Sequence, residues 1–334
     1  MVDTPHHGGR LTEARRLFPS APEPFIDLST GINPLPYPIP PIALSAWTRL
    51  PEPEAIGRLE AVAAKAYGVA AGSMVASVPG TQLLVSLLPR LFPYASVAIL
   101  GPTYGEYARG FEAGGSRVVG VSALDALADA PCAIICNPNN PDGRRFDADT
   151  LLALARQRAG NGLLVVDESF SDLEGDGLSL APHLPLPGVL VLRSLSKCYG
   201  LGGVRLGFAL ADPELAASIR AALGPWPISG PAVEIGSPAL ADRAWREAAK
   251  QQLAQGVARL DGVLREAGMT VIGGTLLFRL AESKKAQDVF RRLGEAGVLV
   301  RGFDYRPDWL RFGIPGGEEE WRRLAAALGS SAVP

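Results

Sequence analysis

The middle of the chain alternates short apolar runs with stretches of helical periodicity. Apolar runs of strand length cover residues 74–78, 96–100, 117–121, 132–136, 163–166 and 189–192. Helical spacing of apolar side chains covers residues 54–67, 83–91 and 149–158, and another helix begins after the turn at 101–107. This rhythm predicts a mostly parallel β-sheet covered by helices on both faces, an α/β fold. In such sheets, ligands bind at the carboxyl ends of the strands.

The two ends of the chain follow different patterns. Proline and glycine punctuate residues 1–55, where the pattern predicts only a short helix over 12–18, a brief strand over 25–28 and an irregular segment over 31–38. Beyond residue 225 it predicts amphipathic helices over 238–267 and 286–296, strands at 270–272, 276–280, 298–301 and 309–315, and a final helix. We therefore expect an N-terminal arm (1–45) that joins a small C-terminal α+β domain (226–334), and a large domain over 46–225.

Composition narrows the class of protein. A chain of 334 residues can bury the cores of one large and one smaller domain. Its 32 basic and 34 acidic residues argue against a nucleic-acid or membrane-surface partner, which requires clustered positive charge. Three cysteines without a CxxC pair predict neither a disulfide framework nor a metal site. The sequence opens without a targeting signal and has no apolar run of about 20 residues, so we expect a cytoplasmic protein.

The stretch from Ser194 to Arg205 concentrates reactive groups. Lys197 follows the apolar run 189–192, where an amine can lose solvent and become a nucleophile toward a carbonyl. Ser194, Ser196 and Arg205 are suitable ligands for a phosphate monoester, and the intervening glycines allow a close turn. Together these groups suggest pyridoxal phosphate (PLP) held by Lys197 as a Schiff base. A glycine-rich surface turn with a solvated lysine would give the same string.

Other polar residues also follow predicted strands. The turn at Gly80 and Thr81 lies between a strand and a helix, where free N–H groups form an anion site, although Thr81 could simply cap the helix. Asp167 closes the apolar run 163–166 and could alternatively be a capping carboxylate. Asn140 lies between two prolines, where bonding to the backbone would also explain it, and Tyr104 could be a core residue. The chain lacks a Rossmann fingerprint and a Walker lysine motif, which argues against those nucleotide sites.

The ordered set of tyrosine, Asn-Pro, aspartate, lysine and arginine resembles the fold-type-I family of PLP-dependent aminotransferases and their relatives over essentially the whole chain. The resemblance implies a large domain with a mostly parallel seven-stranded sheet between helices, a small α+β domain and a homodimer. It implies that Lys197 carries the cofactor, Asp167 pairs with the protonated pyridine nitrogen and Tyr104 stacks on the ring; these three are the expected catalytic residues. The remaining residues of the expected cofactor site are Gly80, Thr81, Gln82, Asn140 (bonded to the phenolate oxygen O3′), Phe170, Ser194, Ser196 and Arg205.

The family resemblance also implies a substrate site. Arg311, in the string Leu310-Arg311-Phe312, matches the arginine that binds the substrate α-carboxylate, although an arginine reaching solvent from an edge strand is an alternative. A phosphate on the substrate also needs a cation, and we expect Arg301 there, with His7, Asn33 and Gly31 of the N-terminal arm.

Within the family, the strings 7–9 and 26–34 are most similar to the threonine-phosphate decarboxylases of cobalamin biosynthesis, relatives of histidinol-phosphate aminotransferase. Aminotransferases usually carry a tyrosine three positions after the aspartate, where this chain has Phe170. The resemblance implies decarboxylation of O-phospho-L-threonine to 1-aminopropan-2-yl phosphate. Two alternatives stay open: an aminotransferase acting on histidinol phosphate or a similar amino acid, and a ligand sensor without turnover, which the retained lysine, aspartate and arginines disfavour.

Overall fold

The computed structural model describes residues 7–175 and 177–330, which form two compact units. The first five residues, on which the expectation of no targeting signal rests, lie outside this range. The larger unit comprises residues 36–140 and 144–246, and the smaller unit comprises the segment up to residue 35, residues 141–143 and the chain from 247 onward. The predicted domains end at 45 and 225 instead. The segment 226–246 belongs to the larger unit because its helix packs there, as described below.

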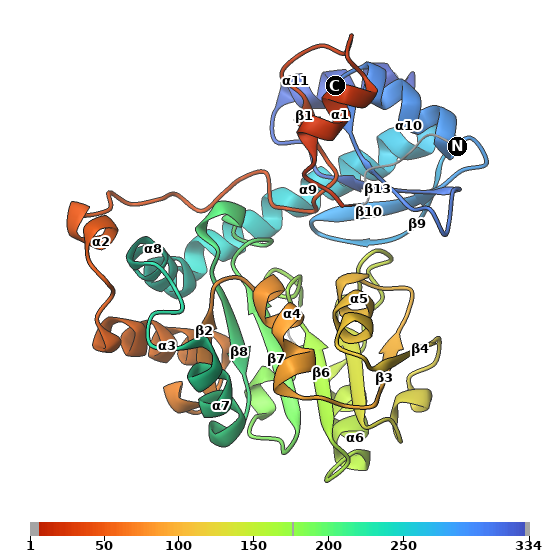
Figure 1. Cartoon of the computed structure of the whole chain (residues 1–334). Helices are drawn as coiled ribbons and strands as arrows, with labels where there is room; N and C mark the ends of the chain where they lie inside the picture. The colour runs from red at the N-terminus through yellow and green to blue at the C-terminus, as the bar shows by residue number, and fades with distance from the viewer. Residues whose placement is uncertain (1–6, 176, 331–334) are drawn as a thin grey trace. The chain divides into compact units, whose positions relative to one another are not determined.

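A seven-stranded sheet forms the centre of the larger unit (Figure 1). Its spatial order is β2-β8-β7-β6-β5-β3-β4. The strands are β2 (Val75–Val78), β3 (Ser96–Leu100), β4 (Arg117–Val121), β5 (Cys132–Cys136), β6 (Leu163–Asp167), β7 (Val189–Ser194) and β8 (Gly207–Leu210). Only β8 runs antiparallel to its two neighbours, and all the other neighbouring pairs are parallel. The prediction of a mostly parallel seven-stranded sheet is therefore confirmed.

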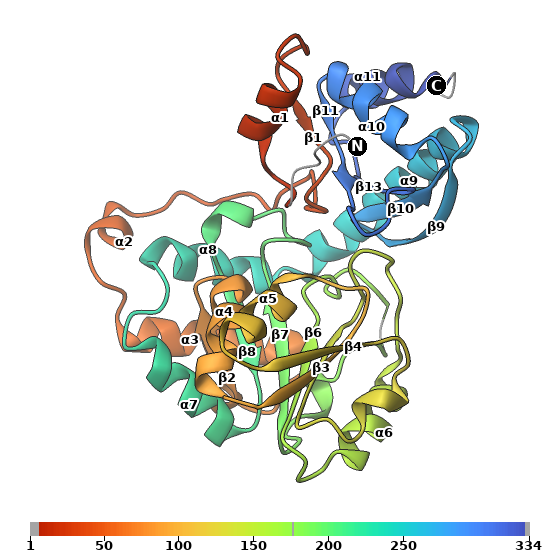
Figure 2. The same cartoon turned by 45° about the vertical axis from the view of Figure 1, so that its right-hand side comes forward.

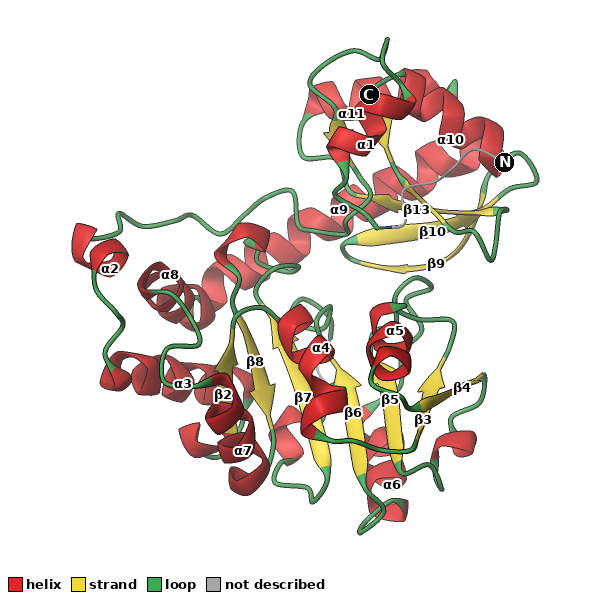
Figure 3. Cartoon of the chain, in the orientation of Figure 1, coloured by secondary structure: helices red, strands yellow, loops and turns green. Residues whose placement is uncertain are grey.

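Helices cover both faces of this sheet, as Figure 3 shows. The helices of the larger unit are α2 (Leu44–Thr48), α3 (Pro53–Tyr67), α4 (Thr81–Leu91), α5 (Glu106–Ala113), α6 (Ala148–Gln157), α7 (Pro213–Leu223) and α8 (Gly230–Ala241). Leu84 of α4, Phe111 of α5 and Ile219 of α7 share one core cluster with strand residues. On the opposite face, the ring of Tyr67 in α3 lies 6.0 Å from that of Phe208, and α8 packs against α3. Helices on both faces explain why every residue of β2, β5, β7 and β8 is buried.

The smaller unit contains a four-stranded antiparallel sheet in the order β12-β13-β10-β9. These strands are β9 (Thr270–Thr275), β10 (Phe278–Glu282), β12 (Arg301–Gly302) and β13 (Trp309–Gly313). Strands β13, β10 and β9 are labelled in Figure 2. A separate parallel pair joins β1 (Ile26–Asp27) to β11 (Val298–Leu299). The helices are α1 (Leu11–Leu17), α10 (Ala286–Glu295), α11 (Glu318–Leu328) and most of α9 (Arg243–Glu266). The strand predicted over 298–301 is thus two strands, which belong to different sheets.

Three elements of the larger unit are absent from the sequence-based prediction: α2, β8 and α7. The helical region predicted from residue 238 starts earlier, with α8 at Gly230. It also divides at Asp242, whose carboxylate accepts a hydrogen bond from the backbone N–H of Trp245 at 2.9 Å. Along the described residues, no helix combines the length and the apolar character needed to cross a bilayer.

Candidate active site

Asp167 lies at the carboxyl end of β6 and accepts hydrogen bonds on both oxygens. The hydroxyl of Tyr107, on α5, donates to Oδ2 at 2.9 Å. The backbone N–H and the hydroxyl of Ser169 donate to Oδ1 at 3.0 Å and 2.5 Å. Burial, and next the charge of Asp167, raise the pKa of Tyr107 well above its usual value, so this hydroxyl keeps its proton. These donors suit an ionised carboxylate, which can pair with a protonated ring nitrogen.

Tyr107 and Ser169 are site residues that the sequence analysis does not single out. Tyr107 is completely buried and carries the helical spacing of an ordinary core residue. The only sequence signal for Ser169 is its place two residues after Asp167, a spacing at which an aspartate can accept a bond from the backbone.

A cradle for an anion lies at the start of α4. Gly80 precedes the helix with φ of +77°, and a Cβ on Gly80 would lie 2.3 Å from Nη2 of Arg205. Arg205 itself has φ of +55° and follows the short 3-10 helix η4 (Gly202–Val204). Its Nη1 donates to Ser196 Oγ at 3.4 Å and to the Gly202 carbonyl at 3.0 Å. A guanidinium beside the free N–H groups of a helix start fits a phosphate monoester, and a side chain at position 80 would fill the space.

Lys197 follows β7, the strand next to β6. Its Nζ lies 5.6 Å from the ring centroid of Phe170, and that ring is almost fully buried. The backbone N–H of Ser196 donates to Ser194 Oγ at 3.2 Å, which shapes the turn that leads to Lys197. The amine, the Asp167 carboxylate and the serine hydroxyls therefore belong to the carboxyl ends of two adjacent strands, where the parallel pattern predicts them.

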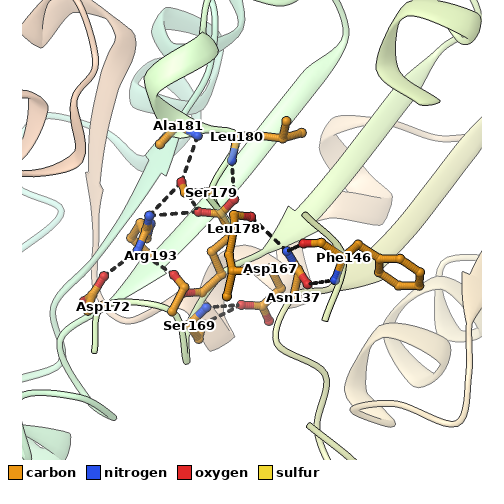
Figure 4. Close-up of polar contacts among 12 residues, drawn as sticks. Asn137, Phe146, Asp167, Ser169, Asp172, Leu178, Ser179, Leu180, Ala181 and Arg193 are labelled. Atoms are coloured by element: carbon orange, nitrogen blue, oxygen red, sulfur yellow. Dashed lines mark hydrogen bonds and ion pairs between the residues drawn. The ribbon is translucent and has the colours of Figure 1, made fainter. Parts of the chain in front are cut away.

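Tyr104, Gln82 and Asn140 also belong to the larger unit. The Tyr104 hydroxyl donates to Oε1 of Gln82 at 2.6 Å, and its ring meets the Tyr107 ring edge-on at 6.3 Å. Asn140 belongs to the loop after β5. That loop is fixed by the Asn137 carboxamide, which bonds the backbone of Phe146 and the carbonyl of Leu178 (Figure 4). All the residues predicted for the cofactor thus lie within one unit.

A buried ion cluster links the ends of β6 and β7 (Figure 4). Arg193 contacts Glu168 at 2.9 Å and Asp172 at 2.5 Å, and its guanidinium lies 4.7 Å from the ring centroid of Tyr67. Glu168 also accepts a hydrogen bond from the N–H of Leu180 at 2.8 Å. Since Glu168 follows Asp167 and Arg193 precedes Ser194, these contacts hold the two strand ends that carry the site.

The residues predicted for the substrate lie in the smaller unit. Arg301 and Arg311 are direct cross-strand partners between β12 and β13. Arg311 is 5% exposed, donates to the carbonyl of Ser29 and lies over the ring of Phe278 at 5.0 Å. Burial, and then the charge of Arg301, lower the pKa of Arg311 to about 10. Like charges opposite each other are unfavourable, so this pair is suited to binding anionic groups.

The arm residues show different degrees of burial. Asn33 is 2% exposed, and its Oδ1 accepts a hydrogen bond from the N–H of Leu35 at 2.9 Å. Gly31 is buried with φ of +61°, and His7 is half-buried. The next residues after His7 contact Ser29, whose carbonyl also binds Arg311.

Comparison with known proteins identifies the family of this chain. The family model described as aminotransferase class I and II matches residues 43–328. A threonine-phosphate decarboxylase from Sinorhizobium sp. is 46% identical to this chain, and the match covers 96% of this chain and 97% of that protein. A threonine-phosphate decarboxylase from Pseudomonas aeruginosa is 38% identical, and the match covers 96% of both proteins. The crystal structure of histidinol-phosphate aminotransferase from Sinorhizobium meliloti in complex with pyridoxal-5'-phosphate has a TM-score of 0.85 at 22% identity, covering 98% of both chains. The chain belongs to the aminotransferase class I and II family.

Proposed function

We propose that the protein is a PLP-dependent carboxy-lyase that converts O-phospho-L-threonine to 1-aminopropan-2-yl phosphate and carbon dioxide. Its similarity to two threonine-phosphate decarboxylases over nearly their whole length supports this activity. The structural observation that carries the proposal is the pairing of Arg301 with Arg311. Two adjacent guanidinium groups suit a substrate with two acidic ends, a carboxylate and a phosphate.

The chain's own residues would hold the cofactor as follows. Asp167, which accepts hydrogen bonds from Tyr107 and Ser169, would keep a proton on the pyridine nitrogen. The start of α4 and Arg205 bind the cofactor phosphate, together with Thr81, Ser194 and Ser196. Lys197 would hold the cofactor aldehyde, Tyr104 would pack on the ring, and Asn140 would donate a hydrogen bond to O3′. Bound in this site, PLP supplies a ring that takes up the electron pair released at the substrate Cα.

Orientation of the substrate selects the bond that breaks. Residues that fix the substrate carboxylate in one orientation would therefore decide whether it leaves as carbon dioxide. We assign Arg311 to the carboxylate and Arg301, His7 and Asn33 to the phosphate, with Gly31 shaping the arm. The Nζ of Lys197 would be the group that returns a proton to the substrate Cα.

Product analysis tests this proposal against transamination. With O-phospho-L-threonine labelled in its carboxyl carbon, we expect labelled carbon dioxide and 1-aminopropan-2-yl phosphate in equal amounts, with no 2-oxo acid required. Transfer of the amino group of histidinol phosphate to a 2-oxo acid, with pyridoxamine phosphate accumulating, would instead support the aminotransferase. The proposed product is the linker of the cobalamin nucleotide loop, so we infer a role in cobalamin biosynthesis. We further propose that the protein acts in the cytoplasm.

A homodimer is the second part of the proposal. Apolar side chains stand exposed along the segment 39–50 of the larger unit: Ile39 (59%), Leu44 (75%), Trp47 (66%) and Leu50 (61%). None of the residues of α2 is buried. An exposed apolar segment of this kind is typical of a contact surface, and we propose a second copy of this chain as its partner.

Light scattering after size exclusion tests the dimer. We expect twice the chain mass for the native protein and a monomer for Trp47→Lys. Ile272→Lys, at an exposed apolar position in the smaller unit, is the matched control and should remain a dimer. A native monomer, or an unchanged mass in Trp47→Lys, would contradict this part of the proposal.

A further inference from the structure

Ser29 contacts its neighbour Asp27 and two distant segments of the smaller unit. Its hydroxyl donates to Oδ1 of Asp27 at 2.5 Å and accepts a hydrogen bond from the backbone N–H of Gly9 at 2.8 Å. Its carbonyl oxygen accepts a hydrogen bond from Nη2 of Arg311. The residue is 1% exposed, so these contacts are made away from water.

The direction of each bond is fixed by the chemistry of its partner. The Ser29 hydroxyl must donate its one hydrogen bond to the Asp27 carboxylate, because an ionised carboxylate only accepts hydrogen bonds. A lone pair of Ser29 Oγ is then left for the N–H of Gly9, which only donates. Asp27 is in turn held by the backbone, because it is paired with Leu299 in the β1–β11 sheet. The Ser29 side chain therefore has one orientation that satisfies both neighbours.

Gly8 packs directly on the same residue. A Cβ on Gly8 would lie 2.4 Å from the carbonyl oxygen of Ser29 and 2.8 Å from its carbonyl carbon, closer than side-chain carbons approach. The backbone of Gly8 and Gly9 therefore packs against Ser29. It shares that anchor with Arg311, which bonds the same carbonyl oxygen.

We propose that Ser29 is a positioning residue, which fixes the His7–Gly9 segment relative to Arg311 so that one substrate meets both. This inference rests on the proposed function, in which Arg311 binds the carboxylate and His7 binds the phosphate. Binding of the carboxylate end and binding of the phosphate end of the substrate can be tested separately. Replacing the Ser29 side chain by alanine releases the N–H of Gly9 but keeps the carbonyl that bonds Arg311, so only the phosphate end should be affected.

Steady-state kinetics of the holoenzyme test the link to His7. We expect Ser29→Ala, Gly8→Ala and His7→Ala each to raise KM for O-phospho-L-threonine about tenfold, the value of one hydrogen bond to a charged group, with kcat nearly unchanged. The double variant His7→Ala/Ser29→Ala should be no worse than His7→Ala alone, because Ser29 acts through His7. Binding of L-threonine, which lacks the phosphate, should be the same in all variants. Three results would overturn the inference. The increases in KM could multiply in the double variant, His7→Ala could leave KM unchanged, or the variants could bind O-phospho-L-threonine and L-threonine equally more weakly.

Hydrogen exchange supplies a readout that does not depend on turnover. In the holoenzyme, a peptide covering residues 7–12 should exchange faster in Ser29→Ala than in the native protein, because the Gly9 N–H loses its acceptor. Ser283→Ala is the matched control, since its hydroxyl accepts a backbone N–H at 3.2 Å elsewhere in the same unit, and it should change neither exchange nor KM. Unchanged exchange in Ser29→Ala contradicts the inference whatever the reaction is. Failure of the native enzyme to bind or decarboxylate O-phospho-L-threonine would instead contradict the proposed function.

Discussion

The hydroxyl of Tyr107 and the carboxylate of Asp167 are joined by a hydrogen bond of 2.9 Å, although 60 positions separate them in the chain. Tyr107 belongs to α5 and Asp167 ends β6, so the bond ties a helix that covers the sheet to the end of a central strand. Its removal would leave a carboxylate oxygen short of a donor while the packing of the ring stayed the same.

Replacing two buried tyrosines measures how much this hydrogen bond contributes to the free energy of unfolding. Tyr107→Phe should lower the free energy of unfolding of the cofactor-free protein by about 1.5–3 kcal/mol, because a hydrogen bond to a charged group is lost. Tyr67→Phe is the matched control, since the Tyr67 hydroxyl is buried without a hydrogen-bond partner among the described residues. Urea denaturation of both variants measures the difference, and equal destabilisation of the two would refute the special role of Tyr107.

The phosphate cradle predicts a strict requirement for glycine at position 80. Alanine there would have to adopt a positive-φ backbone (φ +77°, ψ 145°), which costs about 1–3 kcal/mol, and its Cβ would displace the Arg205 guanidinium. We expect Gly80→Ala to raise the dissociation constant of PLP at least about tenfold, measured by titrating the cofactor-free protein. Gly203→Ala should bind PLP normally because its Cβ would meet nothing within 4 Å. Equal affinities in the two variants would argue against the cradle.

Covalent attachment through Lys197 predicts a spectroscopic change. Lys197→Ala should lose the visible absorbance of the bound cofactor, because no other amine takes its place. Lys65→Ala, at an exposed position in α3, should keep the native spectrum. If the visible band survives in Lys197→Ala, the attachment proposed here is wrong.

The arginine pair predicts that anions stabilise the protein. Inorganic phosphate should raise the Tm of the holoenzyme, in which the cofactor phosphate already fills the cradle, because ligand binding to the folded state adds stability. Arg301→Met should reduce this rise. It should not lower the Tm in the absence of phosphate, since it removes the charge opposite Arg311 and keeps an unbranched chain beside Phe303. A phosphate-induced rise of the same size in both proteins, measured by calorimetry, would exclude this anion site.

The sequence predicts most of the larger sheet because its strands are apolar on both faces. β8 escapes prediction because Gly207–Leu210 is only four residues long and follows a glycine-rich loop. A signal for α7 is present in the sequence. Asp212 precedes Pro213 and accepts hydrogen bonds from the N–H groups of Glu214 and Leu215, the usual start of a helix.

The candidate site is predictable only where chemistry shows in the local sequence. Asp167 and Lys197 can be placed at one edge of the sheet because each follows an apolar run, and in the structure Asp167 ends β6 while Lys197 follows the adjacent strand β7. Tyr107 cannot be found in this way, because a buried tyrosine at helical spacing looks like core packing until its hydroxyl is located in space. The opposition of Arg301 and Arg311 is equally hidden, since it depends on the register of two short strands.

The pairing of β1 with β11 joins residues 26–27 to residues 298–299, nearly the full length of the chain apart. On the ribosome, the first of these strands is therefore made long before its partner emerges. Domains generally fold as units during synthesis, so the central sheet can form before β1 has a strand to pair with. A C-terminal truncation before residue 298 would leave the arm without a strand to pair with, and would remove Arg301 and Arg311 as well.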